Sequence, residues 1–478
     1  MDKNQPATHS AAWTWVAALV AVFMVAIDTL VVTTTLPVIR TELNASLEDL
    51  EWIVNAYTLT FAVFLLTGAA LGDRFGRRKV FTIALLVFTI ASALAGLADN
   101  IEFLIAARAV QGLGAAVVLP LTLTLLASVV PARQRGHAFG LWGAMVGLGI
   151  ALGPVIGGAV TETWSWQWIF WVNVPIGLLL LPVMTRVRES RGGYGRLDPV
   201  GVVLVTAGML GIVSSLVRGN SAGWDSPSIL AGFIVGGLLV LVFIVWQSRA
   251  RTPMVPLSLF RSRGFSLTMV ATIIMPFGVF GAVFLGTQYL QSVLGYSPLE
   301  AGVRTLPWTA MPMIAAPISG ILTDKIGGKP LVILGLTMQA IGVGWIGSVV
   351  GDLTYSKLVV PFVITGLGLG IFLAPIGRLA FGFAPAELEG VASGVSNAIR
   401  QTGTVMGVSV GGAILGANGG YESVATFVNG LEEAHLVAAC ALAAGAVIAL
   451  FIPHLRTQGH GHAVEDEEEE VLAAGAPT

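Results

Sequence analysis

The sequence has little charge and almost no cysteine. Only 11% of its 478 residues are charged, whereas about a quarter are charged in a typical soluble domain, so a water-covered surface is excluded. The formal net charge of −2, with no basic stripe, excludes a nucleic-acid partner. The single cysteine, Cys440, excludes an intrachain disulfide and a thiolate zinc cage. Because Cys440 lies in an alanine-rich apolar run, we predict a buried side chain without chemical function.

Long apolar runs dominate the chain, which is 55% hydrophobic with a mean hydropathy of +0.84. A helix needs about 20 residues to cross about 30 Å of hydrocarbon, and backbone in lipid must satisfy its own hydrogen bonds. We therefore predict an all-α integral membrane protein with fourteen transmembrane helices. The predicted spans are residues 15–38, 52–71, 80–97, 101–130, 139–160, 169–185, 199–217, 229–246, 267–290, 306–322, 331–350, 358–376, 391–415 and 436–452.

Two similar turns suggest an internal repeat. Gly72–Lys79 follows the second span and Gly320–Lys329 follows the tenth. If spans seven and eight are an inserted pair, the turns occupy equivalent places in two six-helix bundles, as in many transporters. The predicted organisation is a cytoplasmic N-terminal tail (1–13), an N-terminal bundle (14–197), the inserted helix pair (198–247), a cytoplasmic linker (248–264), a C-terminal bundle (265–453) and a disordered acidic tail (454–478).

The distribution of basic residues predicts the orientation. An even number of spans places both termini on one side, and cytoplasmic loops carry an excess of Lys and Arg. Most basic residues outside the spans then lie on the side of the termini, and only Arg40, Arg218 and Lys357 lie opposite. Both termini are therefore predicted to be cytoplasmic.

Two charged residues interrupt the apolar runs. A carboxylate at Asp28, mid-way through the first span, costs several kcal/mol unless it is protonated, paired or facing water. Arg108 stays charged and needs a partner, and Gln111 shares its helical face. We predict that Asp28 is a proton-coupling group and Arg108 its electrostatic partner, with no other acidic residue deep in a span. The alternatives are a permanently protonated Asp28 that only packs helices, and an Arg108 that snorkels to the interface.

The turn after the second span has the pattern of a conformational latch. Its residues are Gly72, Asp73, Arg74, Gly76, Arg77 and Arg78. The glycines permit a tight turn and the arginines hold it in the cytoplasm. Asp73 is predicted to cap the N-terminus of a neighbouring helix, a contact made in one conformation and broken in another. The alternative is ordinary solvation of a loop.

The fifth span is rich in glycine. Gly149, Gly153 and Gly157 form one stripe that lets another helix approach, Pro154 bends the helix, and Gly158 adjoins the stripe. Such a helix suits alternating access, although packing alone explains the pattern equally well.

These motifs resemble the major facilitator superfamily, specifically its fourteen-span drug:proton antiporters. The resemblance is carried by Gly72–Arg78, by Gly153–Gly158, by Asp28 with Pro37, by Arg108–Gly112, by Trp168–Gly177 and by Gly390–Gly407. It implies two bundles that rock about a central cavity and export a small molecule against proton entry across a bacterial cell membrane. It implies a transporter and not an enzyme, driven by the proton gradient without a cofactor, a metal or an obligate protein partner.

The resemblance also implies a lipophilic or cationic cargo, because an apolar pocket with a carboxylate suits one. Candidate cavity residues are Asn55, Tyr57, Gln111, Gln288, Asn397 and Arg400. The sequence departs from the family pattern in two places. Gly327-Gly328-Lys329 replaces the more basic loop of the second half, and no acidic residue near the end of the fourth span is available to pair with Arg77.

Two other functions fit the sequence. A proton-coupled symporter that imports a small metabolite would keep the fold and Asp28, although the fifth-helix motif argues against it. A non-transporting membrane sensor or lipid-handling protein is disfavoured by the short loops. No G-x-x-x-x-G-K-[ST] motif is present, which argues against transport driven by ATP.

Overall fold

The computed structural model of the chain describes residues 6–131, 135–192 and 197–455, and this part is helical throughout, without strands. The helices are α1 (Pro6–Glu42), α2 (Leu47–Phe75), α3 (Arg77–Gly96), α4 (Ile101–Val129), α5 (Arg135–Thr163), α6 (Trp168–Trp171), α7 (Asn173–Arg186), α8 (Pro199–Ala222), α9 (Pro227–Arg249), α10 (Arg263–Ser292), α11 (Pro298–Arg304), α12 (Leu306–Thr309), α13 (Met311–Ile326), α14 (Gly328–Val349), α15 (Ser356–Gly382), α16 (Glu389–Ala417) and α17 (Val424–Ala449). Short 3-10 turns occupy Leu257–Arg261, Val350–Asp352 and Ala386–Leu388.

The predicted class, an all-α membrane-spanning protein, is confirmed. Within the described residues, thirteen helical segments are long and apolar enough to cross a membrane, with α6–α7 and α11–α13 each counting as one broken span. Helix α16 fills the place of the predicted span 391–415 and is 29 residues long, but it is not among the thirteen. It carries Asn397, Arg400 and Gln401 inside its length, which lower its hydropathy. The count of fourteen therefore stays a prediction.

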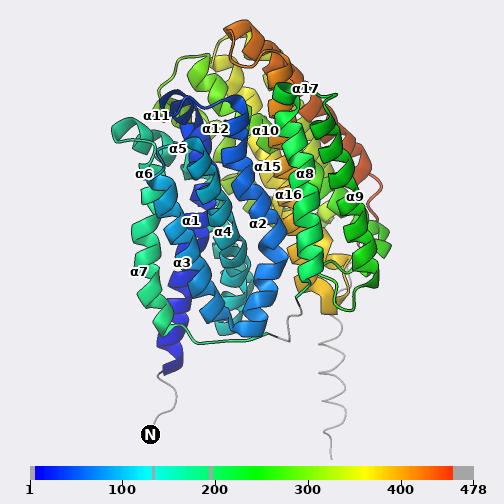
Figure 1. Cartoon of the computed structure of the whole chain (residues 1–478). Coiled ribbons are helices and arrows are strands. Elements are labelled where there is room, and N and C mark those ends of the chain that lie inside the picture. The colour runs from blue at the N-terminus through cyan, green and yellow to red at the C-terminus, as the bar shows by residue number, and fades with distance from the viewer. Residues whose placement is uncertain (1–5, 132–134, 193–196, 456–478) are drawn as a thin grey trace, which may run out of the picture.

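The helices form an N-terminal half (α1–α7) and a C-terminal half (α10–α17), with α8 and α9 along one side (Figure 1). We call the end of the molecule where α1 ends and α2 begins the upper end, as it is drawn in Figure 1. The two turns that resemble each other in sequence lie at the opposite, lower end. Each turn contains a glycine with a positive φ angle. Gly76, between α2 and α3, has a φ of 105°, and Gly327, between α13 and α14, has a φ of 81°. Side chains rarely adopt this conformation, which explains the glycine in both turns.

Hydrogen bonds join the two halves at the upper end. The Glu162 carboxylate, on α5, accepts from Ser297 Oγ at 2.6 Å and from the Leu299 amide at 3.0 Å. Gln291 of α10 donates to the Thr34 carbonyl of α1 at 2.7 Å. The upper end is therefore closed.

The lower half of α5 is far less packed. A methyl group added at Gly140 or Gly143 would meet no atom within 4 Å, and Phe139 and Leu141 are exposed. The halves are thus held together above and are open along α5 below.

Helix α8 contacts both halves. Its Val213 belongs to one buried cluster with Leu59 of α2 and Val405 of α16. Near the upper end, Asn220 donates to the Ala413 carbonyl of α16 at 2.7 Å. The inserted pair is therefore fixed on the boundary between α2 and α16, which belong to different halves.

Asp198 closes the lower end of the inserted pair. Its carboxylate accepts hydrogen bonds from the Gly201 amide, Trp246 Nε1 and Gln247 Nε2 at 2.7–2.8 Å. Burial alone would raise the pKa of Asp198, but these hydrogen bonds outweigh it and hold the pKa below its usual value. The contacts join the start of α8 to the end of α9.

The structure corrects the prediction made for Cys440 and extends the first helix. Cys440 is exposed and not buried, because this part of α17 lies at the periphery, where Leu436 and Val437 are exposed too. Helix α1 begins at Pro6, so most of the predicted N-terminal tail is helical. The predicted acidic tail lies almost entirely outside the described residues.

Candidate functional site

Asp28 of α1 and Arg108 of α4 form a buried ion pair inside the N-terminal half. Arg108 Nη1 lies 2.7 Å from Asp28 Oδ2. Asp28 is 0% exposed and Arg108 is 2% exposed. The same nitrogen donates to Gln111 Oε1 at 2.7 Å, and Arg108 Nε donates to the Ile53 carbonyl at 3.3 Å. Arg108 thus points into the bundle, and its charge is compensated there.

Two amides and a hydroxyl complete the surroundings of the Asp28 carboxylate. Gln111 Nε2 and Asn173 Nδ2 donate to Asp28 Oδ1 at 2.8 and 3.0 Å. Both amides also donate to Ser92 Oγ, at 3.2 and 3.1 Å, and Ser92 donates to the Phe170 carbonyl at 2.9 Å. We call Asp28, Ser92, Arg108, Gln111 and Asn173 the Asp28 cluster. Five side chains from α1, α3, α4 and α7 therefore share one network.

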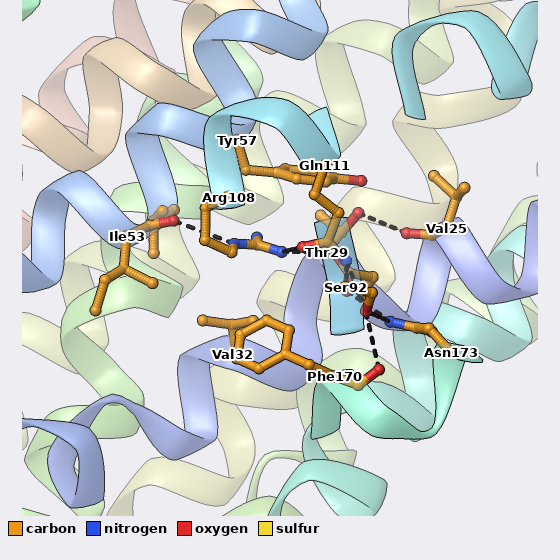
Figure 2. Close-up of polar contacts among 12 residues, drawn as sticks. Val25, Thr29, Val32, Ile53, Tyr57, Ser92, Arg108, Gln111, Phe170 and Asn173 are labelled. Carbon is orange, nitrogen blue, oxygen red and sulfur yellow. Dashed lines mark hydrogen bonds and ion pairs between the residues drawn. The ribbon is translucent and has the colours of Figure 1, made fainter. Parts of the chain in front are cut away.

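Aromatic rings enclose the guanidinium of Arg108. Figure 2 shows this side chain reaching across between Tyr57 and Phe170. The centre of the guanidinium lies 4.2 Å from the centroid of the Tyr57 ring and 5.7 Å from that of Phe170. Cation–π contacts of this kind are strongest where water is excluded. The rings therefore shield the ion pair and add to its stability.

All three groups that contact the Asp28 carboxylate are hydrogen-bond donors. As a carboxylate, Asp28 accepts three hydrogen bonds, one of them charge-assisted. If a proton binds, Arg108 keeps the Gln111 and Ile53 oxygens as acceptors. The guanidinium is then never left without a partner.

The sequence-based prediction missed three residues. Ser92 and Asn173 are polar groups in apolar runs, and only their helical neighbours could have placed them at Asp28. Glu51 is the more important omission, because it is an acidic residue 1% exposed within α2. The predicted second span began at residue 52, whereas α2 begins at Leu47, so Glu51 lies inside the bundle.

The six predicted cavity residues lie in both halves and have different partners. Tyr57 and Gln111 surround Arg108. Asn55 donates to Ser409 Oγ of α16 at 3.0 Å and ties the halves together, and Gln288 accepts from the Tyr421 hydroxyl.

Asn397 and Arg400 line a cavity in the C-terminal half. Its volume is about 120 Å³, and its walls include Phe372 and Ile376. Arg400 Nη2 donates to Asn397 Oδ1 at 2.7 Å. Arg400 is the charged residue among the lining groups, and the rest of the wall is mostly apolar.

In the latch turn, the structure pairs Asp73 with Arg77, whereas we predicted a helix-capping contact. Arg77 Nη2 lies 2.8 Å from Asp73 Oδ1, which supplies the partner that the sequence did not reveal. The N-terminus of α3 is instead capped by Glu189, which lies in the segment after α7. Its carboxylate accepts from the Arg78 amide at 2.9 Å and the Lys79 amide at 3.1 Å, in the first turn of α3. A negative charge is favoured at this position by the helix dipole.

The other latch residues shape the turn. Gly72 packs closely on Leu121 of α4, and a methyl group at Gly76 would lie 2.8 Å from the Glu189 carboxyl carbon. Arg74 is exposed, with its guanidinium 5.2 Å from the centroid of the Phe75 ring. The glycines therefore permit the approach of α4 and of the segment after α7.

The glycine stripe of α5 faces α1. Methyl groups at Gly149, Gly153 and Gly157 would lie 2.6, 3.1 and 2.5 Å from the nearest atoms of α1. Gly158 faces the other half, because a methyl group there would lie 2.2 Å from the Pro298 carbonyl oxygen at the start of α11. Pro154 also touches the C-terminal half at Gly302. The fifth helix thus packs closely both on α1 of its own half and on α11 of the other half at the upper end.

We expect Glu189→Ala to loosen the first turn of α3. The substitution removes a charged cap, which costs about 1 kcal/mol. Hydrogen exchange of the Arg78 and Lys79 amides should therefore be about fivefold faster, as measured by NMR or mass spectrometry. Glu189→Gln keeps one acceptor and should have a smaller effect. Unchanged exchange in Glu189→Ala would contradict the capping role.

Two helical halves that close at one end, with a compensated ion pair buried in one half, define a transporter of the membrane. The chain belongs to the Major Facilitator Superfamily, whose family model matches residues 18–408 and 285–474. It is a transporter and not an enzyme.

Characterised bacterial proteins are similar over most of the chain. The tetracenomycin C resistance and export protein of Streptomyces glaucescens is 36% identical over 413 residues, which cover 85% of this chain and 76% of that protein. The multidrug efflux pump LfrA of Mycolicibacterium smegmatis is 35% identical over 86% of this chain and 82% of its own length. The relatives therefore include transporters of drugs and antibiotics.

Solved structures share the fold. A D-xylose–proton symporter has a TM-score of 0.68 at 17% sequence identity, covering 94% of this chain and 99% of its own. A bacterial homologue of the human lysosomal transporter Spinster, in an inward-facing and unoccupied conformation, has a TM-score of 0.65 at 15% identity, covering 95% and 98%. At these identities the similarity shows the fold alone.

Proposed function

We propose that this transporter exports small lipophilic or cationic compounds in exchange for protons, by alternating access across a bacterial plasma membrane. The observation that carries this proposal is the Asp28 cluster, a carboxylate paired with a cation and buried inside a membrane-spanning half. Both termini then lie in the cytoplasm, and the two six-helix halves with the inserted pair are the moving parts. The proton gradient drives the cycle without a cofactor or an obligate protein partner.

The position of Asp28 on α1 supports coupling between protonation and movement. One turn and more above Asp28, α1 contacts the C-terminal half, where Thr287 donates to the Thr33 carbonyl at 3.2 Å. The adjoining face of α1 packs on the glycine stripe of α5. A change of charge at Asp28 therefore acts on a helix that takes part in the closed upper end. A ligand, including a proton, shifts the equilibrium only by binding one conformation better than the other.

The direction and the cargo are supported by the relatives. An export protein and an efflux pump, each at least 35% identical, favour export of drug-like compounds. The mostly apolar cavity beside Arg400 suits lipophilic molecules. Entry of one proton supplies about 2.3 kcal/mol per 100 mV, together with the pH gradient.

The test is efflux of a cationic dye from proteoliposomes with an imposed pH gradient, comparing the wild type with Asp28→Asn. We expect gradient-dependent efflux in the wild type and its loss in Asp28→Asn, because the amide binds no proton. The matched control is Asp99→Asn, which changes an exposed aspartate and should leave efflux intact. Gradient-driven dye uptake would indicate a symporter instead, and efflux that survives in Asp28→Asn would refute coupling at Asp28.

A further inference from the structure

Glu51 lies between the two halves, at the upper end of α2. It is 1% exposed, and a methyl group at Gly412 of α16 would lie 2.1 Å from its Oε1. One turn further along α2, Asn55 donates to Ser409 of α16. The Glu51 carboxyl therefore fills the space that Gly412 leaves, and it is part of the contact that closes the upper end.

This carboxyl has no compensating charge. In the described part of the chain, Glu51 Oε2 has no hydrogen-bond partner, and no ion pair involves Glu51. Asp28, by contrast, is paired and accepts three hydrogen bonds. The two buried acidic residues thus lie in opposite electrostatic surroundings.

The charged groups near Glu51 contact other residues, and none of them forms an ion pair with it. Glu48, one turn earlier on α2, repels a negative charge at Glu51 and pairs with Arg218 of α8 at 3.6 Å. Arg40 of α1 lies over the Tyr421 ring, 3.6 Å from its centroid.

Among the described residues, no basic group on the remaining helices forms an ion pair with Glu51 either. Gly412 and Ser409 of α16 carry no charge. Arg108 of α4 is held by Asp28. Burial raises the pKa of the Tyr421 phenol in the loop before α17, and Arg40 opposes this shift. The nearest basic groups therefore leave a charge on Glu51 uncompensated.

A buried carboxylate without a compensating charge costs several kcal/mol. The Glu51 carboxyl is therefore neutral while α2 and α16 are packed together. When α2 and α16 separate, water reaches the carboxyl and stabilises its charged form. Because the closed form binds one proton more, closure is favoured at low pH and becomes less favourable as pH rises.

We propose that Glu51 is a second proton-binding site, which takes up a proton while the upper end is open and holds it while that end is closed. The step adds one proton to one carboxylate and needs no other reactant. This inference rests on the proposed proton-coupled function, for which the upper end faces the side from which protons enter.

The test measures closure of the upper end as a function of pH in the full-length transporter in nanodiscs. Spin labels at Thr41→Cys and Glu422→Cys, both exposed near the upper end, report the separation of the halves in a Cys440→Ala background. In the otherwise unchanged protein, the ratio of closed to open molecules should fall as pH rises, by up to about tenfold per pH unit for one linked proton. Glu51→Gln, a neutral isostere, should stay closed and lose most of this dependence, and Glu51→Ala should lose it too.

Glu48→Gln is the matched control, because it changes an acid one turn away that already has a partner, and it should keep the pH dependence. If Glu51→Gln and Glu51→Ala both titrate like the unchanged protein, the proposal is overturned. The proposed export function fails by a separate result, the absence of gradient-dependent efflux in the wild type. Loss of pH-dependent closure in both Glu51 variants supports the site whichever way the transport assay falls.

Discussion

Replacing Arg108 with methionine is expected to destabilise the protein by about 3–5 kcal/mol, because it leaves the Asp28 carboxylate buried without its cation. The pair is 0% and 2% exposed, so water cannot take the place of the guanidinium. Methionine keeps much of the volume between Tyr57 and Phe170 and isolates the loss of charge. Reversible unfolding in bilayer-like micelles or nanodiscs measures the difference in the free energy of unfolding.

A double substitution separates the charge from the shape. With Asp28→Asn and Arg108→Met together, no uncompensated charge remains, and we expect most of the lost stability to return. Arg218→Met is the matched control, since its partner Glu48 lies 3.6 Å away at a largely exposed site and the pair contributes less than about 1 kcal/mol. Equal losses in the free energy of unfolding for Arg108→Met and Arg218→Met would show that burial does not increase the contribution of the Asp28–Arg108 pair to stability.

Gly158→Val is expected to abolish transport by holding the upper end open. A methyl group at Gly158 would already lie 2.2 Å from the Pro298 carbonyl oxygen and 2.7 Å from Leu299 Cα, both backbone atoms of the other half. These atoms cannot rotate away, so α5 and α11 must separate. Dye efflux should be lost, and the spin-label distance across the upper end should shift to its longer value.

Gly147→Val is the control on the same helix. A methyl group at Gly147 would meet nothing closer than Met313 Cγ, at 3.7 Å. This variant should transport normally, since the far end of a flexible side chain can move. Wild-type efflux from Gly158→Val would mean that the contact between α5 and α11 is not needed in the cycle.

The sequence predicted the helical fold from its long apolar runs, and it predicted Asp28, Arg108 and Gln111 of the Asp28 cluster because such polar side chains are rare in those runs. Asp28 and Arg108 stand out there, and any stable fold must give them partners. Which partners they find depends on how α3 and α7 pack, so Ser92 and Asn173 could not be placed. For the same reason the sequence did not reveal that Glu189, and not Asp73, caps α3. This contact depends on where the segment after α7 lies.

Glu51 was missed for a different reason. An acidic residue beside the first tryptophan of an apolar run usually marks the end of a span, where water reaches it. Helix α2 begins four residues earlier, and Gly412 on α16 provides room for the carboxyl. Burial at this point arises from contact between residues far apart in the chain, as the separation of 354 positions between Asn55 and Ser409 shows. No local pattern records such a contact.

Helix α8 has a consequence for leakage through the bilayer. It covers the boundary between α2 and α16 from the lipid side, with Val213 packed on both helices and Asn220 bonded to α16. Without this cover, we expect a lipophilic compound to diffuse laterally between α2 and α16 back into the bilayer. With that boundary covered, we expect a lipophilic molecule to enter the protein from the bilayer along the lower half of α5, where methyl groups at Gly140 and Gly143 would meet no atom within 4 Å.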